Sequence, residues 1–396
     1  MNTFGTIFRV GIFGESHGEE IGVVVDGVAP GLELGEQDFL ADIARRRSGA
    51  KGTTPRIEAD EPHILSGVYE GHTTGTPLAV VFRNTNTRSN DYEGLQDVPR
   101  PGHADYTANL KYGGFQDPRG GGHFSGRLTL PVVAAGVIAK KLLSATVAGA
   151  TRGQVQFRCD AALTEIGGIT DAAQWDAVLE QASQEGDSLG GVVECVVSGI
   201  PAGLGEPFWD SVESKLSHAI FAIPGVRGVE FGDGFAAARM KGSEHNDVYA
   251  PFGARNCGSQ QHECCHGGEG HECHGEGHDH EGGCCHGGEG HGDGHCHGEG
   301  HHEGGCCHRR RGLVTPATNH AGGVNGGITN GNPLVFRVAF KPTSSIAKAQ
   351  ETYDFAKGEM TTLQVPGRHD TCFALRTPVI VESMAAIVLA DLLGQS

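Results

Sequence analysis

Residues 24–32 are Val-Val-Asp-Gly-Val-Ala-Pro-Gly-Leu, and residues 196–204 are Val-Val-Ser-Gly-Ile-Pro-Ala-Gly-Leu. In each copy an apolar run that is typical of a strand leads into a turn rich in Gly and Pro. An acidic helix start follows each copy, at Glu36 and at Glu206. Short Val/Gly matches arise by chance, but we favour an internal duplication, in which two related αβ halves pack around one core.

The pattern of apolar residues around these copies alternates short strands with longer helices. A polar turn at 14–18 separates the first two predicted strands, and Pro131 stands in the first turn of the longest predicted helix. The predicted strands are Phe4–Phe13, Ile21–Val25, His63–Tyr69, Thr76–Phe82 and Leu334–Phe340, and the predicted helices are Glu36–Arg47, Leu128–Ser144 and Val379–Leu393.

The segment 257–308 differs from the rest of the chain in composition. It holds nine of the 12 Cys, 13 of the 22 His and ten acidic residues but no Lys or Arg, so the remaining chain carries −8 of the formal charge of −18. With almost no apolar side chains it cannot offset its own ordering entropy, which predicts a mobile loop when no metal is bound. We therefore predict one main domain, 1–256 and 309–396, interrupted by a low-complexity insertion, 257–308.

Repeated Cys-Cys-His triplets in this insertion indicate metal ligation rather than a disulfide framework, because the chain is long and carries no secretion signal. Thiolate and imidazole suit zinc, nickel or copper(I), and the repeated pairs predict several sites of graded affinity. A solvated acidic loop that binds metal only as any His-rich tract does is the alternative. The predicted ligands are Cys264, Cys265, His266, His271, Cys284, Cys285, His286, His291, Cys306, Cys307 and His308.

Several partners and locations are disfavoured by composition. We expect no membrane span, because the best apolar run, Val132 to Leu143, is interrupted by Lys140 and Lys141. Residues 1–10 lack the charged-then-apolar order of a signal peptide, which predicts a cytoplasmic protein. The acidic balance provides no basic surface for nucleic acid.

The turn Gly14-Glu15-Ser16-His17-Gly18 formally matches the nucleophile elbow of hydrolases. That motif requires a helix directly after the turn, whereas this turn leads into another predicted strand. A His beside Gly in a tight turn is better placed as an exposed acid or base.

Cationic and His-containing motifs in the first half indicate a site for an anion. Arg45, Arg46, Arg47 and Lys51 form one cluster, and guanidinium groups bind carboxylate and phosphate bidentately. A solvated helix end is the plainer interpretation of this cluster. Arg100-Pro101-Gly102-His103-Ala104-Asp105 places a His on a rigid turn before a helix, where its pKa suits acid–base chemistry. Residues 120–127, Gly-Gly-Gly-His-Phe-Ser-Gly-Arg, provide backbone N–H groups for an anion at a helix N-terminus, or form a plain Gly-rich loop.

In combination, these motifs resemble the chorismate synthase family. Each motif alone is modest, but they occur in order across almost the whole chain outside the insertion. The matching segments are Gly14–Gly18, Arg100–Thr107, Gly120–Arg127, Asn319–Gly323, Gly326–Ile328, Lys341–Ile346 and Gly367–Asp370.

The resemblance implies a layered βαβ sandwich of two αβ halves, a homotetramer, and a lyase that uses reduced FMN. The implied reaction is the 1,4-anti elimination of phosphate from 5-enolpyruvylshikimate 3-phosphate, without net redox change, with the flavin reduced by a separate reducing system. His17 would protonate the leaving phosphate, His103 would act on the flavin, and Asp370 would relay a proton with Ser16 and Ser125. The substrate or NADP would be bound by Arg45, Arg46, Lys51, Arg100 and Arg127. The flavin would be bound by His123, Phe124, Ser125, Pro224, Gly225, Gly326, Lys341, Pro342, Thr343, Ser344, Ser345 and Arg368.

Two other classes of function remain open on the sequence. The insertion alone is compatible with a metal-storage or metal-delivery protein. The Gly strip and basic residues are also compatible with a flavin-based oxidoreductase, although no dinucleotide-binding fingerprint stands in a strand–turn–helix context. The ordered set of motifs favours the lyase.

Overall fold

The structure is a computed structural model of the chain, and it describes residues 2–54, 58–86, 94–250, 315–365 and 369–395. It divides into two compact units, of which the first comprises Met1–Val248 and Pro316–Ser396 and the second Tyr249–Thr315. The second unit contributes residues to the short strands β11 (Tyr249–Ala250) and β12 (Thr315–Pro316). The rest of that unit, which includes all the predicted metal ligands, lies outside the described residues.

The first unit contains the same succession of elements twice. The first half consists of β2 (Arg9–Gly14), β3 (Glu20–Asp26), α1 (Leu40–Arg46), β4 (His63–Ser66), β7 (Leu78–Arg83) and α3 (Thr129–Ala150). The second half consists of β8 (Arg158–Ile166), β9 (Gly191–Ser198), α5 (Val212–Ile220), β10 (Val226–Phe231), β15 (Leu334–Phe340) and α7 (Pro378–Gln395). Strand order β2-β3-β7-β4 in one antiparallel sheet corresponds to β8-β9-β15-β10 in the other, which confirms two related αβ halves.

Two threonines give the duplication an atomic signature. The Oγ1 atom of Thr73 accepts the Leu32 N–H at 3.0 Å and donates to the Ala29 carbonyl at 2.7 Å. In the other half, the Oγ1 atom of Thr329 accepts the Leu204 N–H at 2.9 Å and donates to the Pro201 carbonyl at 2.8 Å. The two copies of the sequence pattern therefore form the same turn and are closed by the same hydrogen bonds.

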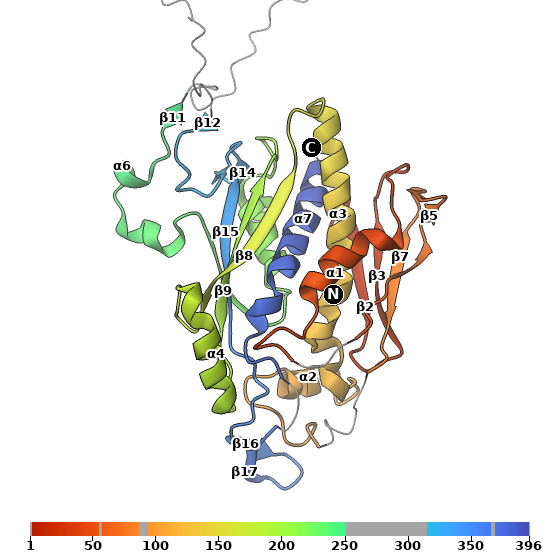
Figure 1. Cartoon of the computed structure of the whole chain (residues 1–396), viewed down its shortest axis with the longest axis vertical. Coiled ribbons are helices and arrows are strands. Elements are labelled where there is room, and N and C mark those ends of the chain that lie inside the picture. Colours follow the sequence, from red (N-terminus) through yellow and green to blue (C-terminus); the bar gives the residue numbers. More distant parts are fainter. Residues whose placement is uncertain (1, 55–57, 87–93, 251–314, 366–368, 396) are drawn as a thin grey trace, which may run out of the picture. The chain divides into compact units, whose positions relative to one another are not determined.

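The helices lie between the two sheets, as Figure 1 shows for α3 and α7. Helix α3 packs on β3 and β7 of the first sheet, α7 packs on β8 and β9 of the second, and the two helices pack along each other. Most of their apolar residues are buried. The expected βαβ sandwich is confirmed.

The remaining elements join or extend these layers. Phe208–Asp210 (η6) and Glu36–Phe39 (η1) are single turns that precede the equivalent helices α5 and α1. The others are β1 (Thr3–Phe4), β5 (Val68–Tyr69), β6 (His72–Thr73), α2 (Asp105–Tyr112), η3 (Arg119–Phe124), η4 (Gly126–Leu128), η5 (Ala172–Gln174), α4 (Trp175–Gln184), η7 (Gly234–Arg239), α6 (Gly242–His245), β13 (Val324–Asn325), β14 (Ile328–Thr329), β16 (Gln350–Asp354), β17 (Glu359–Leu363) and η8 (Phe373–Arg376).

Two sequence-based expectations about these elements need correction. The strand predicted over Phe4–Phe13 is interrupted, because the Asp391 carboxylate accepts the backbone N–H groups of Thr6, Ile7 and Phe8. The second helix does not start at Glu206, since α5 begins at Val212, where the Ser211 hydroxyl accepts the Ser214 N–H.

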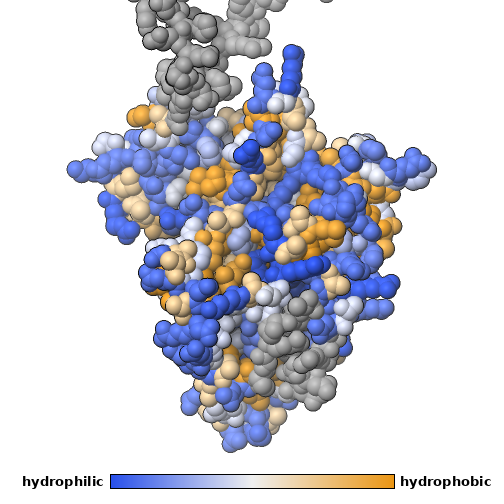
Figure 2. Space-filling view, viewed as in Figure 1, coloured by the Kyte–Doolittle hydropathy of each residue, from blue (hydrophilic) through white to orange (hydrophobic). Residues whose placement is uncertain are grey.

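The sequence pattern predicted no apolar run long enough to span a membrane. By length and composition alone, that expectation is wrong for two helices. Gly126–Ala150 and Pro378–Gln395 meet both criteria, with mean hydropathies of 1.6 and 1.5 over an 18-residue window in each. However, 67% and 72% of these windows are buried inside the protein, as expected for core helices between two sheets. On the face in Figure 2, apolar side chains occur in small groups separated by hydrophilic ones.

A buried carboxylate ties the helical layer to the second sheet. Glu382 in α7 is 2% exposed and accepts two hydrogen bonds from Arg45, at 2.7 and 2.5 Å, and one from Lys140 at 2.8 Å. It also accepts the Ala161 N–H of β8 at 2.9 Å. Burial alone would raise the pKa of Glu382, but the hydrogen bonds and charges of Arg45 and Lys140 outweigh it and lower that pKa.

We expect Glu382→Gln to lower the free energy of unfolding by about 1–2 kcal/mol at neutral pH, a modest cost because Arg45 is half-exposed and water partly compensates it. A carboxylate with a lowered pKa stabilises the fold above its unfolded pKa, and this contribution is lost as the pH falls through the lowered value. The difference between wild type and variant, measured by urea unfolding, should therefore shrink below about pH 4.5. A difference that does not change with pH would contradict this explanation.

Candidate active site

The turn between β2 and β3 packs directly against the Gly-rich strip before α3. The Ser16 N–H donates to the Gly122 carbonyl at 3.1 Å, and the His123 ring bonds the Gly14 carbonyl at 2.8 Å. Ser16 is fully buried and His17 is 7% exposed. Two motifs about a hundred residues apart in the sequence are thus hydrogen-bonded to each other.

This contact explains why the strip is glycine. Gly120 has a φ of 62°, and a Cβ atom there would lie 2.5 Å from Cδ2 and 2.6 Å from Nε2 of His17. At Gly122, with a φ of 52°, a Cβ would lie 2.1 Å from the Asp117 carbonyl oxygen. Any side chain at either position would push the His17 turn or the strip out of place.

His103 belongs to a compact group with two neighbours on the same turn. Its Nδ1 lies 2.6 Å from the Asp105 carboxylate, which also accepts Nε and Nη2 of Arg100, both at 2.7 Å. Burial alone would raise the pKa of Asp105, but Arg100 and His103 outweigh it and hold that pKa well below its usual range. An ionised Asp105 fixes the ring orientation of His103 through Nδ1.

Arg46 and Arg127 share one buried carboxylate, Asp60. Arg127 donates from Nη1 to Asp60, whose second oxygen lies 3.6 Å from Nη1 of Arg46. Arg46 also donates to the Thr129 hydroxyl at 3.0 Å and to the Gly126 carbonyl at 3.0 Å. Burial, followed by the nearby positive charge of Arg376, lowers the pKa of Arg46 to about 9, so it stays protonated at neutral pH.

Asp370 is held in place from both sides. One oxygen accepts Nη2 of Arg376 at 2.6 Å, and the other accepts the Thr54 N–H at 2.8 Å. The Asp370 carbonyl accepts the Thr343 hydroxyl at 2.8 Å. Nε of Arg376 is buried and has no hydrogen-bond partner among the described residues.

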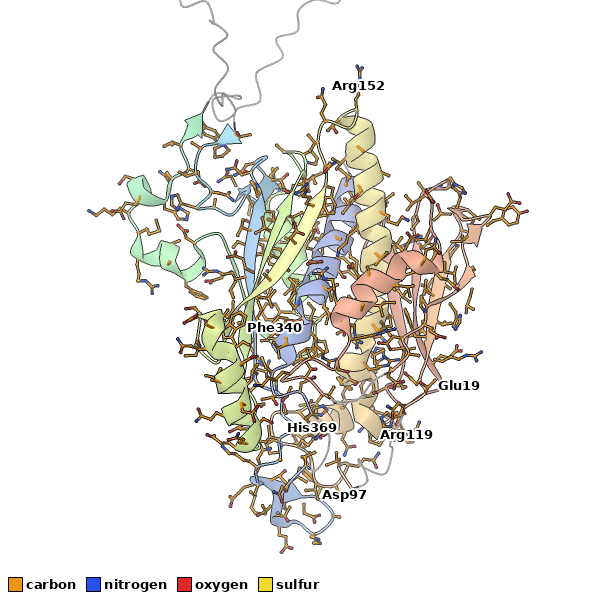
Figure 3. All side chains as sticks on the ribbon, in the orientation of Figure 1. Glu19, Asp97, Arg119, Arg152, Phe340 and His369 are labelled. Atoms are coloured by element: carbon orange, nitrogen blue, oxygen red, sulfur yellow. The ribbon has the colours of Figure 1, made fainter. Side chains whose placement is uncertain are left out.

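Most of these side chains line a cavity of about 790 Å³, within the size range of small-molecule sites. Figure 3 places His369, Arg119 and Glu19 toward the end of the first unit opposite Arg152 at the end of α3. Equivalent segments of both halves line the cavity: those after α1 and α5, and those before α3 and α7. Its cationic lining residues are Arg46, Arg47, Arg100, Arg127, Arg227, Lys341 and Arg376, and its carboxylates are Glu58, Asp60 and Asp370.

Most of the predicted flavin residues meet at this cavity. Lys341 donates to the Gly102 carbonyl at 3.0 Å, and Ser345 accepts from Arg100 at 2.9 Å, so the loop after β15 is clasped to the His103 turn. Gly326 lies in the β13–β14 turn and does not belong to the described lining, and Arg368 lies outside the described residues. The predicted flavin residues in the lining are His123, Phe124, Ser125, Pro224, Gly225, Lys341, Pro342, Thr343, Ser344 and Ser345.

Most of the predicted acid–base and anion-binding residues line the cavity. His103, Asp370, Arg46, Arg100 and Arg127 line the cavity, as does Ser125, whereas Ser16 and His17 lie behind Gly120.

Arg45 and Lys51 are the exceptions, because the structure does not bring them to the cavity lining that it describes. Arg45 points in a different direction from Arg46 and pairs with Glu382, and Lys51 lies 3.4 Å from the exposed Glu180. A run of three Arg at a helix end sends successive side chains in different directions, which the sequence cluster conceals.

Sequence reasoning missed Arg376, Asp60 and Asn84. Arg376 lies two residues before the start of α7, as Arg127 lies two residues before the start of α3, so the duplication was a usable signal. Asp60, with a φ of 52°, and Asn84, directly after β7, are single polar residues whose role depends on tertiary contacts. Nothing in the local sequence indicates them.

Among the residues that the structure describes, no group of three or more His, Cys, Asp or Glu side chains is arranged to hold a metal ion. The predicted Cys and His ligands of the insertion lie outside those residues.

A βαβ sandwich with a cation-rich cavity lined by both halves defines an enzyme that acts on a small anionic molecule. A family profile described as chorismate synthase matches residues 8–393. The chorismate synthase of Chitinophaga pinensis is 50% identical over 391 residues, which cover 99% of this chain and 96% of that protein. That of Synechococcus elongatus is 39% identical over 408 residues, covering 98% and 96%.

A solved structure titled "Crystal Structure of Chorismate Synthase" has the same fold, with a TM-score of 0.62, 22% sequence identity, and coverage of 98% of this chain and 92% of that chain. The chain belongs to the chorismate synthase family. It is therefore a lyase of the shikimate pathway.

Proposed function

We propose that the cavity binds reduced FMN together with 5-enolpyruvylshikimate 3-phosphate and eliminates phosphate to give chorismate. The observation that carries this proposal is the charge of the lining, seven cationic side chains against three carboxylates, in a chain whose formal net charge is −18. A trianionic substrate and a flavin phosphate both fit such a lining. Phosphate and carboxylate groups also match the bidentate geometry of guanidinium groups.

The anion-binding residues differ in what they still have to offer a ligand. Nη2 of Arg127 and Nε of Arg376 are buried and lack partners among the described residues. A buried guanidinium nitrogen without a partner is costly, so both positions favour a bound anion. Arg100, in contrast, is bonded by Asp105 and Ser345 and acts mainly by holding the His103 turn.

Proton movements are assigned to His17, to His103 and to a relay of Asp370 with two serines. His17 donates a proton to the departing phosphate, and Asp105 orients His103 so that its Nε2 acts at the flavin. Asp370, with Ser125 and Ser16, moves the proton taken from the substrate ring. When bound, reduced FMN supplies an electron-rich ring that lends charge as phosphate leaves and assists removal of the ring proton.

The proposal extends to assembly, location and flavin reduction. The exposed aromatic side chains Phe115, Phe208, Trp209 and Phe235, each at least 79% exposed, support burial in a homotetramer. The family resemblance supports a cytoplasmic enzyme whose flavin is reduced by a separate system.

Anaerobic incubation with photoreduced FMN should yield chorismate and phosphate in equal amounts. A second assay tests the source of the electrons: hydride transfer from added NADPH to bound flavin would indicate a built-in reductase.

A second function, metal binding by the insertion, is favoured by its composition, nine Cys and 13 His within 257–308. The flanks of this segment lie next to each other, because the Ala317 N–H donates to the Val248 carbonyl at 2.6 Å and the Asp247 carboxylate accepts the Thr318 hydroxyl at 2.6 Å. We therefore expect that the insertion can be removed without disturbing the catalytic residues.

We expect a short Gly-Ser linker in place of 257–308 to leave the fold and the lyase activity intact and to abolish metal uptake, because the flanks need only be joined. Elemental analysis after dialysis against zinc, nickel and copper salts, with anaerobic turnover of the same two proteins, checks both parts. A folded but inactive deletion variant would show that the insertion belongs to the catalytic machinery.

A further inference from the structure

Asn84 lies between two parts of the site that are distant in sequence. It follows β7 directly, and its backbone N–H donates to the Glu19 carbonyl at 3.0 Å. Its side-chain amide donates from Nδ2 to the carbonyls of Gly18, at 2.8 Å, and Glu15, at 3.1 Å. Its Oδ1 accepts Nε of Arg127 at 3.0 Å.

Only one orientation of the amide satisfies all three contacts. The two carbonyl oxygens accept and require the NH₂ group, whereas Nε of Arg127 donates and requires the oxygen. Asn is therefore matched to this position in a way that neither Asp, which when ionised has no donor, nor Leu, which has similar branching but no polar group, would be.

Arg127 is in turn held at two of its three guanidinium nitrogens. Asn84 takes Nε and Asp60 takes Nη1, while Nη2 is left without a partner among the described residues. The Arg127 side chain is only 6% exposed, so its orientation is fixed before a ligand binds. The remaining nitrogen, Nη2, is a donor that a bound anion would satisfy.

We propose that Asn84 is a positioning residue that sets the His17 turn and the Arg127 guanidinium in register with each other. This inference rests on the proposed function, in which His17 protonates a phosphate that must also meet the cationic site. Asn84 is not part of the cavity lining among the described residues, so it acts through its neighbours. A misplacement of about 1 Å between an acid and its leaving group can reduce turnover about 10²-fold.

The test uses Asn84→Ala, with Asn332→Ala as a matched control. Asn332 also donates its side-chain amide to two backbone carbonyls, those of Pro316 at 3.1 Å and Thr318 at 2.8 Å, but these carbonyls belong neither to the His17 turn nor to Arg127. We expect Asn84→Ala to lower kcat at least tenfold and to change substrate Kd less, because Asp60 still holds Arg127. The control should keep kcat within about twofold of wild type.

A double-mutant cycle with His17→Ala separates positioning from general damage. If Asn84 acts through the His17 turn, Asn84→Ala should lower kcat little further once His17 is gone, which is the non-additivity expected of coupled residues. Full multiplication of the two losses, or a kcat for Asn84→Ala within about twofold of wild type, would overturn the inference.

Hydrogen exchange tests the same contact without relying on the reaction. Amides of residues 14–20 should exchange faster in Asn84→Ala than in wild type or in Asn332→Ala. Unchanged exchange in that segment would also overturn the inference. Failure of the wild-type enzyme to release phosphate would refute the proposed function, while exchange would still decide whether Asn84 holds the turn.

Discussion

Replacement of His17 or His103 by Ala is expected to lower turnover about 10²-fold or more at saturating reduced FMN and substrate. His17 lies behind Gly120, where a Cβ atom would lie 2.6 Å from its Nε2, and the proposed function places the departing phosphate beside that residue. His103 is oriented by Asp105, 2.6 Å from Nδ1. The proposed function assigns each ring a single proton transfer, which a methyl group cannot perform.

Steady-state assays under nitrogen check this prediction, with the exposed His72 changed to Ala as a control that should keep normal turnover. Near-normal turnover of both His17→Ala and His103→Ala would remove the proposed acid–base assignment. Asp105→Asn tests the orienting role separately, since it keeps the shape of the side chain but loses the charge that fixes the His103 ring.

Arg127→Ala should raise the substrate Kd by about tenfold to 10²-fold. A charge-assisted hydrogen bond contributes about 1.5–3 kcal/mol, and each 1.4 kcal/mol is about a factor of ten in Kd. The variant removes the buried Nη2 donor and also leaves Asp60 with less compensating charge. Both effects disfavour a bound phosphate or carboxylate.

Equilibrium titration of substrate into the enzyme–flavin complex measures this effect. Arg9→Ala is a suitable control, because Arg9 is an exposed cation whose side chain pairs with Asp26. An unchanged Kd in Arg127→Ala would contradict the placement of the substrate beside Arg127.

Much of the fold could be predicted from periodicity and from one repeated pattern. The two Val/Gly copies indicated a duplication, and the structure shows why they recur: both turns are closed by a threonine, Thr73 or Thr329, that lies more than 40 residues further on in the sequence. The threonines themselves were not predicted, because their partners become neighbours only when the strands pair.

The site was predictable where a motif is local and not where it depends on packing. His103 and Asp105 are two residues apart, so their pairing follows from one turn. Arg45 and Arg46 are adjacent, yet one binds Glu382 and the other lines the cavity, because a helix separates neighbours by about 100°. Asn84 joins residues 66 and 43 positions away, a contact that only the folded sheet creates.

The central claim is that this cavity performs a redox-neutral elimination that needs reduced FMN without consuming it. Stopped-flow absorbance under strict anaerobiosis, combined with phosphate detection, tests it most directly. We expect many equivalents of phosphate and chorismate per flavin, no turnover with oxidised FMN, and a flavin that is still reduced when the substrate is exhausted. Stoichiometric oxidation of the flavin, or phosphate release without any flavin, would contradict the account.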